Sequence, residues 1–278
     1  MAFGNRLINT SVASNLNCLA SSHVGPFTSA SYLRDAQIGV STTSFWGKMD
    51  STLHPDGFCY STSRSGVGYW LISKTDLSTN TTTTISQGTP GPAYYGFVGV
   101  ANKDELLYIV ESDFSRIVTY QTDGTRLSVF SNTATYQTWG AGWLDYNCIT
   151  DEFILTDTEG SGTQQACKLH FIDGTTGNHK RTIDISATVG LAHGLVWANV
   201  GGDGVLFVMN YYNSRAYQFN YNGSYTGFYV DYSPFIYVQN QNRGGFFNPQ
   251  NDELTLGTFN SQSGDSLIKN KHRVFQLA

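Results

Sequence analysis

The sequence predicts an all-β protein that forms a single β-propeller of four-stranded blades. Two stretches read almost alike, LYIVESDFSRIVTYQTDGTRLSVF from Leu107 and LFVMNYYNSRAYQFNYNGSYTGFY from Leu206. Each begins with an apolar run, continues through a polar turn to an Arg, and then reaches a Gly. Similar units along one chain indicate a modular array. Alternating apolar and polar residues, typical of strands, are common, whereas the spacing of amphipathic helices is rare.

Five copies of this unit emerge when the second apolar residue of each is used as an anchor. The anchors are Phe58, Tyr108, Phe153, Phe207 and Leu254, at intervals of 50, 45, 54 and 47 residues. A repeat of about 40 to 50 residues with four strands is typical of a propeller blade.

Each unit offers short strand-like runs joined by turns that carry Gly, Asp or Asn. The first run precedes the anchor, at 45–49, 97–100, 142–144, 194–197 and 244–247. The second run contains the anchor. The third run lies within 68–73, 115–122, 167–173, 215–221 and 272–278. A fourth run is found in the first four units, at 81–86, 126–130, 180–186 and 225–232.

The fifth unit has no fourth run before Ala278, so the edge of its sheet needs a strand from elsewhere. We expect residues 36–41, or else residues 5–12, to pair with residues 272–277 and close the ring. Five blades would then occupy residues 36–278, and residues 1–35 would be an N-terminal arm. In the alternative, residues 1–44 supply most of a sixth blade.

Composition narrows the possible partners. Only 13% of the residues are charged and the formal net charge is −5, so we expect no binding to nucleic acid. The sequence contains no run of about 20 apolar residues, so we expect no membrane insertion. The first residues lack the apolar core of a signal peptide. The four Cys are expected to be buried thiols, with a disulfide between two of them as the alternative outside a cell.

The repeats resemble the NHL class of β-propeller repeat. The resemblance rests on LYIVESDFSRIVTYQTDG and LFVMNYYNSRAYQFNYNG, which run from an apolar strand through Ser-Arg to Asp-Gly or Asn-Gly. It covers two of the five units, because the units at Phe153 and Leu254 replace the Arg turn by other sequences. The resemblance implies a propeller that most often serves as a recognition platform, although some relatives are hydrolases or lyases. We expect Arg116 and Arg215 to have equivalent structural roles.

Catalytic candidates are few. A glycosidase needs two carboxylates roughly 5–9 Å apart, and the innermost runs offer Asp50 and Asp145. A Ser-His-Asp hydrolase needs a positioned nucleophile, and the sequence has no GxSxG motif. Among the His residues, His193 is the one expected at the mouth of the tunnel, in a structural role. We therefore expect binding in preference to catalysis.

A metal site is the other chemical candidate. Glu111, Asp157 and Asn210 follow their anchors by three or four residues and would converge if equivalent positions faced one another across the ring. The alternative is that they begin turns and bond to the local backbone, as Asp and Asn commonly do. We favour the alternative and expect neither a metal nor a cofactor.

Aromatic and amide residues in expected loops are the more informative group. Tyr rings give contact area at a low entropy cost, and amides give adaptable hydrogen bonds. The run 233–252 is the best candidate for a contact loop. The expected binding residues are Tyr211, Tyr212, Phe235, Tyr237, Asn240 and Asn242.

The sequence as a whole indicates a non-enzymatic binding or structural propeller. Low charge and many Ser, Thr, Asn and Tyr residues are similar to the composition of phage virion and tail accessory proteins. We expect a virion or extracellular location, protein partners in a larger assembly, and recognition of a receptor or glycan. The alternatives are a propeller hydrolase acting on glycans or lactones, and a secreted lectin-like protein.

Overall fold

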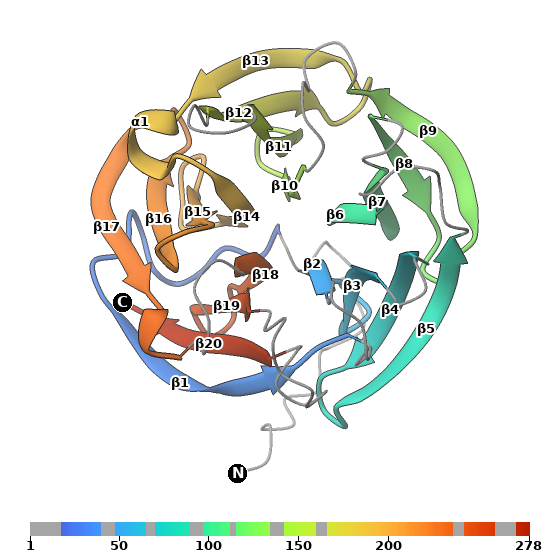
Figure 1. Cartoon of the computed structure of the whole chain (residues 1–278), viewed down its shortest axis with the longest axis horizontal. Coiled ribbons are helices and arrows are strands. Elements are labelled where there is room, and N and C mark those ends of the chain that lie inside the picture. The colour runs from blue at the N-terminus through green and yellow to red at the C-terminus, as the bar shows by residue number, and fades with distance from the viewer. Residues whose placement is uncertain are drawn as a thin grey trace.

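The structure is a computed structural model, and it describes residues 18–39, 48–64, 70–88, 97–111, 115–133, 142–159, 166–235, 242–258 and 271–278. Within these ranges the strands form five four-stranded antiparallel sheets. The sheets are arranged as blades around a central axis, with the first strand of each blade innermost (Figure 1). The predicted five-bladed propeller is confirmed.

The blades follow one another along the chain. Blade 1 consists of β2 (Lys48–Leu53), β3 (Phe58–Arg64), β4 (Trp70–Asp76) and β5 (Thr81–Gly88). Blade 2 consists of β6 (Phe97–Lys103), β7 (Leu106–Glu111), β8 (Arg116–Tyr120) and β9 (Arg126–Asn132). Blade 3 consists of β10 (Leu144–Asn147), β11 (Glu152–Glu159), β12 (Ala166–Asp173) and β13 (His179–Asp184).

Two short helices border the last two blades. Blade 4 consists of β14 (Ala192–Ala198), β15 (Val205–Asn210), β16 (Arg215–Asn220) and β17 (Tyr225–Asp231). Blade 5 consists of β18 (Asn242–Asn248), β19 (Glu253–Thr258), β20 (Lys271–Leu277) and β1 (Ala30–Gln37). The helix α1 (Ser186–Val189) precedes β14, and the 3-10 turn η3 (Ser233–Phe235) follows β17. No described helix is long and apolar enough to cross a membrane.

The matching turns of blades 2 and 4 explain why their sequences are alike. Gly124 and Gly223 have φ angles of +90° and +86°, and each donates its backbone N–H to the residue three positions earlier at 2.9 Å. Both also touch the preceding blade, because an added Cβ would overlap the Ile85 carbonyl or the Ile183 side chain. Glycine is required there for its positive φ and for the close approach.

The packing between blades is mainly apolar. One buried cluster joins blades 3 and 4 and includes Leu169, Phe171, Leu206 and Phe219. A second cluster joins blades 2 and 3. Burial of one such side chain contributes about 1.5–3 kcal/mol, so contacts between neighbouring blades stabilise the ring.

The inner strand of blade 1 is shifted from its expected place. The inner strand β2 begins at Lys48 and ends at Leu53, whereas the sequence pattern placed it at 45–49. The interior here is lined by small hydroxyl residues, including Ser51, Thr52, Ser61 and Thr62, which are at most 3% exposed. A search for apolar runs misses a strand that buries Ser and Thr.

An N-terminal strand closes the ring, as expected, but it lies earlier in the sequence. β1 pairs antiparallel with β20, from Ala30 opposite Leu277 to Gln37 opposite Lys271. The expected strand was 36–41, and the second choice, 5–12, lies outside the described residues. The strand begins earlier because Thr28 and Ser29 already bond to the carbonyl of Ala278 at 2.9 Å.

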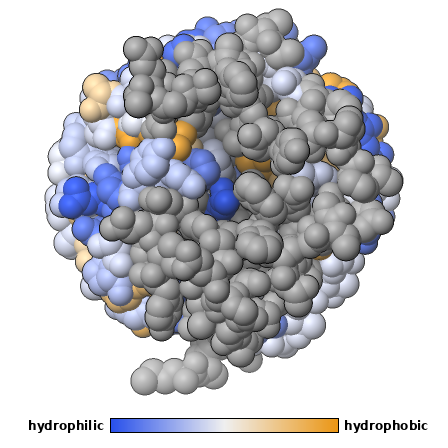
Figure 2. All heavy atoms as spheres, viewed as in Figure 1, coloured by the Kyte–Doolittle hydropathy of each residue, from blue (hydrophilic) through white to orange (hydrophobic). Residues whose placement is uncertain are grey.

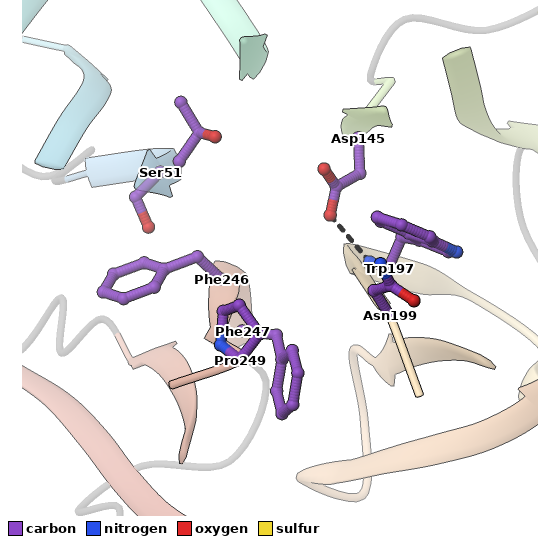
Figure 3. A pocket seen from close by; sticks show the side chains of 8 residues that line it. Ser51, Asp145, Trp197, Asn199, Phe246, Phe247 and Pro249 are labelled. Carbon is purple, nitrogen blue, oxygen red and sulfur yellow. Dashed lines mark hydrogen bonds between the residues drawn. The ribbon is translucent and has the colours of Figure 1, made fainter. Parts of the chain in front are cut away.

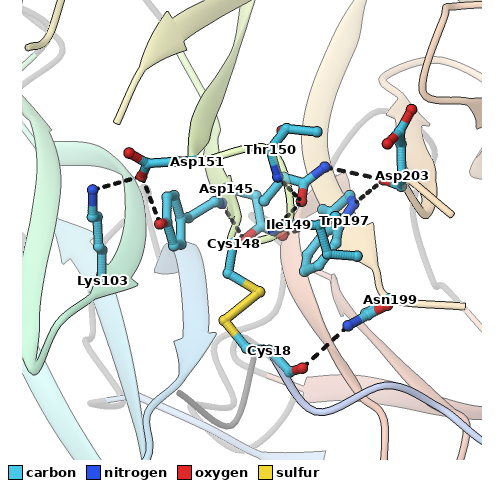
Figure 4. Close-up of a disulfide and its surroundings, with 12 residues drawn as sticks. Cys18, Lys103, Asp145, Cys148, Ile149, Thr150, Asp151, Trp197, Asn199 and Asp203 are labelled. Carbon is cyan, nitrogen blue, oxygen red and sulfur yellow. Dashed lines mark hydrogen bonds and ion pairs between the residues drawn. A yellow bond between two sulfur atoms is a disulfide. The ribbon is translucent and has the colours of Figure 1, made fainter. Parts of the chain in front are cut away.

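The segment before β1 crosses blades 3, 4 and 5. Cys18 forms a disulfide with Cys148 after β10, and its carbonyl accepts a hydrogen bond from the Asn199 side chain at 3.2 Å (Figure 4). Ser21 donates its backbone N–H to Asn199 at 2.9 Å, and Phe27 is buried in the core of blades 4 and 5. Two of the four Cys therefore form a disulfide, which was the alternative expectation. Cys59 and Cys167 are buried thiols, as first expected.

Candidate functional site

The two carboxylates of the innermost strands are bound to backbone. Asp50 accepts the N–H of Ser51 at 2.9 Å and that of Val100 in blade 2 at 3.1 Å. Asp145 accepts the N–H of Tyr146 at 2.7 Å and that of Trp197 in blade 4 at 2.6 Å. Each carboxylate therefore joins its own inner strand to that of the next blade, which is a structural role.

The space beside Asp145 is small. Ser51, Trp197 and Phe246 help to line a cavity of about 10 Å³ (Figure 3). That volume is enough for about one water molecule and excludes a sugar ring. Burial raises the pKa of Asp145 to about 7, because the charged form loses solvation and the two N–H groups only partly offset the loss.

The three candidate metal ligands do not converge. Glu111 binds Arg116 at 2.6 Å and the Tyr120 hydroxyl at 2.8 Å. The Asn210 side-chain carbonyl accepts the N–H of Tyr212 at 2.7 Å. Asp157 faces His170 inside blade 3, with 3.5 Å between Oδ2 and Nε2. The turn interpretation holds for Asn210, and the other two belong to side-chain networks of their own blades.

Tyr211 and Tyr212 lie in the β15–β16 turn, at the outer end of a series of rings. Trp143 and His193 have ring centroids 4.6 Å apart, His193 and Tyr211 4.2 Å, and Tyr211 and Tyr212 4.9 Å. Trp143 is fully buried, whereas Tyr212 is 45% exposed. The series therefore runs from the buried core to the surface.

A buried cation supports this series. Arg243 at the start of β18 donates a hydrogen bond to Nδ1 of His193 at 3.1 Å. Burial lowers the pKa of Arg243 to about 10. Burial and the neighbouring guanidinium hold the pKa of His193 well below its usual value. His193 therefore accepts this hydrogen bond through Nδ1 as a neutral ring, and it lies between Trp143 and Tyr211.

The other expected binding residues lie elsewhere. Phe235 in η3 stacks on Tyr32 of β1 with centroids 4.2 Å apart, and it also packs on Phe275. Asn242 is the first residue of β18, so residues 242–248 of the expected contact loop form an inner strand. Tyr237 and Asn240 lie outside the described residues.

A wide hollow lies at the outer side of blade 4. It is an open groove of about 580 Å³ between residues 26–28 and β17. The lining residues are Pro26, Phe27, Thr28, Asn220, Tyr225, Thr226, Gly227 and Phe228. Hydrophilic and hydrophobic residues are mixed on the left of the face in Figure 2, over the blade 4 part of the ring.

One buried side chain sets the two walls of this groove. Gln218 accepts the N–H of Phe27 at 2.9 Å through Oε1 and donates through Nε2 to the Phe27 carbonyl at 3.0 Å. It also donates to the Thr226 hydroxyl at 2.9 Å. A register shift between β16 and β17 places residues 226–228 in a bulge at this point. Bulges are common beside functional sites because they redirect side chains.

Sequence reasoning missed this groove. Tyr225 and Phe228 stand in a strand that the repeat predicted, so the search for loop aromatics did not select them. The available signal was Gly227 within a strand pattern, which suggests a bulge or a close approach of backbone. The contribution of residues 26–28 depends on the long-range contact with Gln218, which the local sequence does not reveal.

Comparison with known proteins supports the β-propeller fold described above. No family model matches the sequence, and no curated relative is found. A chain of the nidogen/laminin complex has a TM-score of 0.52 and 15% identity, and the match covers 83% of this chain and 85% of that chain.

Two further solved structures are similar. The PQQ-bound aldose sugar dehydrogenase from Streptomyces coelicolor has a TM-score of 0.54 and 12% identity, with 91% of this chain and 99% of that chain covered. A Bacteroides thetaiotaomicron VPI-5482 protein of unknown function has a TM-score of 0.51 and 12% identity, with 90% and 76% covered. At these identities the likeness shows the β-propeller fold alone.

Proposed function

We propose that this chain is a non-enzymatic recognition module that binds a glycan in the groove between residues 26–28 and β17. The observation that carries the proposal is the groove itself, an open surface groove of about 580 Å³ whose lining combines aromatic rings with polar groups. Tyr225 and Phe228 offer ring faces, and Asn220 offers a polar side chain. A sugar presents both an apolar C–H face and hydroxyls, so its chemistry matches this lining.

The tunnel supports binding over hydrolysis. Asp50 and Asp145, the candidate acid and base, both accept backbone hydrogen bonds from two strands. The cavity beside Asp145 has room for about one water molecule. A glycosidase needs space for a sugar between its carboxylates. The groove on blade 4 offers that space, but no pair of carboxylates is among its lining residues.

We further propose that the module belongs to a larger assembly, with a phage-type virion surface or tail as the leading form. The low charge of 13% and the abundance of Ser, Thr, Asn and Tyr support this setting. The Cys18–Cys148 disulfide supports a virion or extracellular location, because disulfides persist in oxidising surroundings. The glycan would then be a receptor on the target surface.

A glycan array with quantitative follow-up tests the proposal. Tyr225→Ala should weaken binding of a captured glycan by about tenfold, because stacking on an aromatic anchor typically contributes 1–2 kcal/mol. Val129→Ala is the control, since Val129 is an exposed apolar residue of the outer strand β9 in blade 2 and does not line the groove. Tyr212→Ala tests whether the β15–β16 turn contributes.

Three results would contradict the proposal. The wild-type protein would bind no glycan, Tyr225→Ala would bind as tightly as Val129→Ala, or a glycan or lactone would be hydrolysed with turnover lost in Asp145→Asn. The last result would establish the hydrolase alternative.

A further inference from the structure

Residues 18–29, here named the strap, connect a disulfide in blade 3 to the closing strand β1 of blade 5. Ser21 and Gly25 of the strap donate backbone N–H groups to the β14–β15 turn of blade 4, at 2.9 and 2.8 Å. The strap then continues into β1 at the rim of the ring (Figure 1, blue). It therefore runs from blade 3 along blade 4 to blade 5.

The disulfide makes the strap part of a covalent loop that passes every blade. The bond joins Cys18 to Cys148, which lies 130 positions later in the chain. Between them the chain passes through β1 in blade 5, then through blades 1 and 2, and into blade 3. The strap spans the remaining sector along blade 4. All five blades therefore lie along one closed covalent loop.

The contacts that hold β1 in blade 5 are non-covalent. The strand pairs with β20 along its length. Arg34 binds Glu253 at 2.8 Å, and Asp35 binds Arg273. Arg34 and Asp35 are 38% and 33% exposed, so solvent weakens both ion pairs. If β1 detached, the ring would open beside β20, which would become an exposed sheet edge.

The disulfide lies where a reductant can reach it. Both of its Cys residues are partly exposed, and the residues that follow them, Leu19 and Ile149, are 37% and 47% exposed (Figure 4). The thiolate of a small dithiol can attack one sulfur, and the second thiol of the reductant then displaces the protein. Two electrons and two protons pass to the protein, which gains two thiols, and the dithiol becomes a disulfide.

We propose that the Cys18–Cys148 disulfide is a redox clasp that locks the strap and β1 onto the ring. With the bond intact the strap is fixed at both ends, so its openings are confined to a short loop. After reduction Cys18 is no longer tied to blade 3, and the strap detaches together with β1 in local openings. Residues 26–28, one wall of the blade 4 groove, belong to the strap and open with it, whatever the groove binds.

Hydrogen–deuterium exchange of the full chain, read by mass spectrometry, tests the clasp. Dithiothreitol should accelerate exchange of wild-type peptides from residues 18–37 and from β20 by about a hundredfold, the effect expected for untying a loop of about 20 residues. Peptides from blade 2 should change much less. A variant with both Cys18→Ser and Cys148→Ser should match the reduced wild type without any reductant. Adding dithiothreitol to this variant should change nothing, because Cys59 and Cys167 are already thiols.

Each of four results would overturn the proposal. The first is air-oxidised wild-type protein with four free thiols. The second is unchanged exchange of the strap and β1 after reduction. The third is equal acceleration in blade 2, which would show that the bond stabilises the fold as a whole and does not act on the closing strand. The fourth is acceleration by dithiothreitol in the double variant, which would assign the effect to something other than this bond.

Discussion

Blades 2 and 4 have almost the same strand pattern, yet they place their charges differently. In blade 2 Glu111 ends β7 and binds Arg116 at 2.6 Å and Arg126 at 3.2 Å. In blade 4 the corresponding residue to Glu111 is Asn210, which caps the following turn. Arg215 therefore has a different partner, Asp231 of β17 at 3.5 Å. The two Arg occupy equivalent places and both form ion pairs within their blades, but they bridge different strands.

The same comparison explains why blade 4 has a groove. Thr119 of β8 bonds to Ser128 of the neighbouring outer strand at 3.1 Å. The corresponding residue of β16 is Gln218, whose longer side chain reaches the backbone of Phe27. Arg126, which binds Glu111, corresponds to Tyr225, which lines the groove. The buried strand positions preserve the fold, whereas a few positions at the outer strands determine the surface.

Replacing Gln218 by the residue of blade 2 should have the largest effect. Gln218→Thr should lower the free energy of unfolding by about 3 kcal/mol, because the buried N–H and C=O of Phe27 lose their partner and a cavity forms. Urea denaturation measures the change, and the glycan titration should weaken with it. Gln87→Thr, on the exposed strand β5, is the control and should change stability little. Equal effects of the two variants would show that Gln218 does not fix the groove walls.

Neutralising the blade 2 carboxylate should have a smaller effect. Glu111→Gln should cost about 2 kcal/mol, because hydrogen bonds between a carboxylate and charged donors are stronger than neutral ones. Arg116 and Arg126 are 29% and 42% exposed, so water compensates part of the loss. Thermal and urea unfolding measure it. A loss below about 0.5 kcal/mol would show that this network behaves as an ordinary surface pair.

The repeat made most of the fold predictable. Buried alternation around anchors such as Tyr108 and Phe207 located four strands in each of the first four units and three in the fifth, because the same packing is needed in every blade. The inner strand at Ser51 escaped because small hydroxyls replace apolar residues there. The last unit lacks a fourth strand, so a closing strand from the N-terminal part of the chain could be predicted. Its register could not be predicted, because it depends on contacts of Thr28 and Ser29 with Ala278.

The candidate site was much less predictable. Tyr211 and Tyr212 were selected as loop aromatics, and the structure places Tyr211 beside His193 and Tyr212 beside Tyr211. The groove instead depends on a bulge at Gly227 and on Gln218, which contacts residues far away in the sequence. Such contacts leave no local periodicity, and a lone Gln in a strand pattern is commonly read as a solvent-facing residue.

The exposed ion pair of blade 4 should have the smallest effect. Arg215 and Asp231 are 37% and 38% exposed, so Asp231→Asn should change stability by less than about 0.5 kcal/mol at neutral pH. The dependence of stability on pH gives a second comparison between Asp231 and Glu111. Burial alone would raise the pKa of each carboxyl, but hydrogen bonds and cations outweigh it and lower both values.

A lowered folded-state pKa stabilises the protein above the unfolded pKa, about 4.3 for Glu and 3.9 for Asp, and this stabilisation is lost as pH falls through the folded value. Urea unfolding between about pH 6 and pH 3 should therefore show a shallower acid loss in Glu111→Gln, where the more buried carboxylate is removed. Asp231→Asn should flatten the acid loss less, because the Asp231 carboxyl is more exposed and solvent screens its pair with Arg215. Equal flattening in both variants would mean that the two blades use their carboxylates alike, despite the different strands that they join.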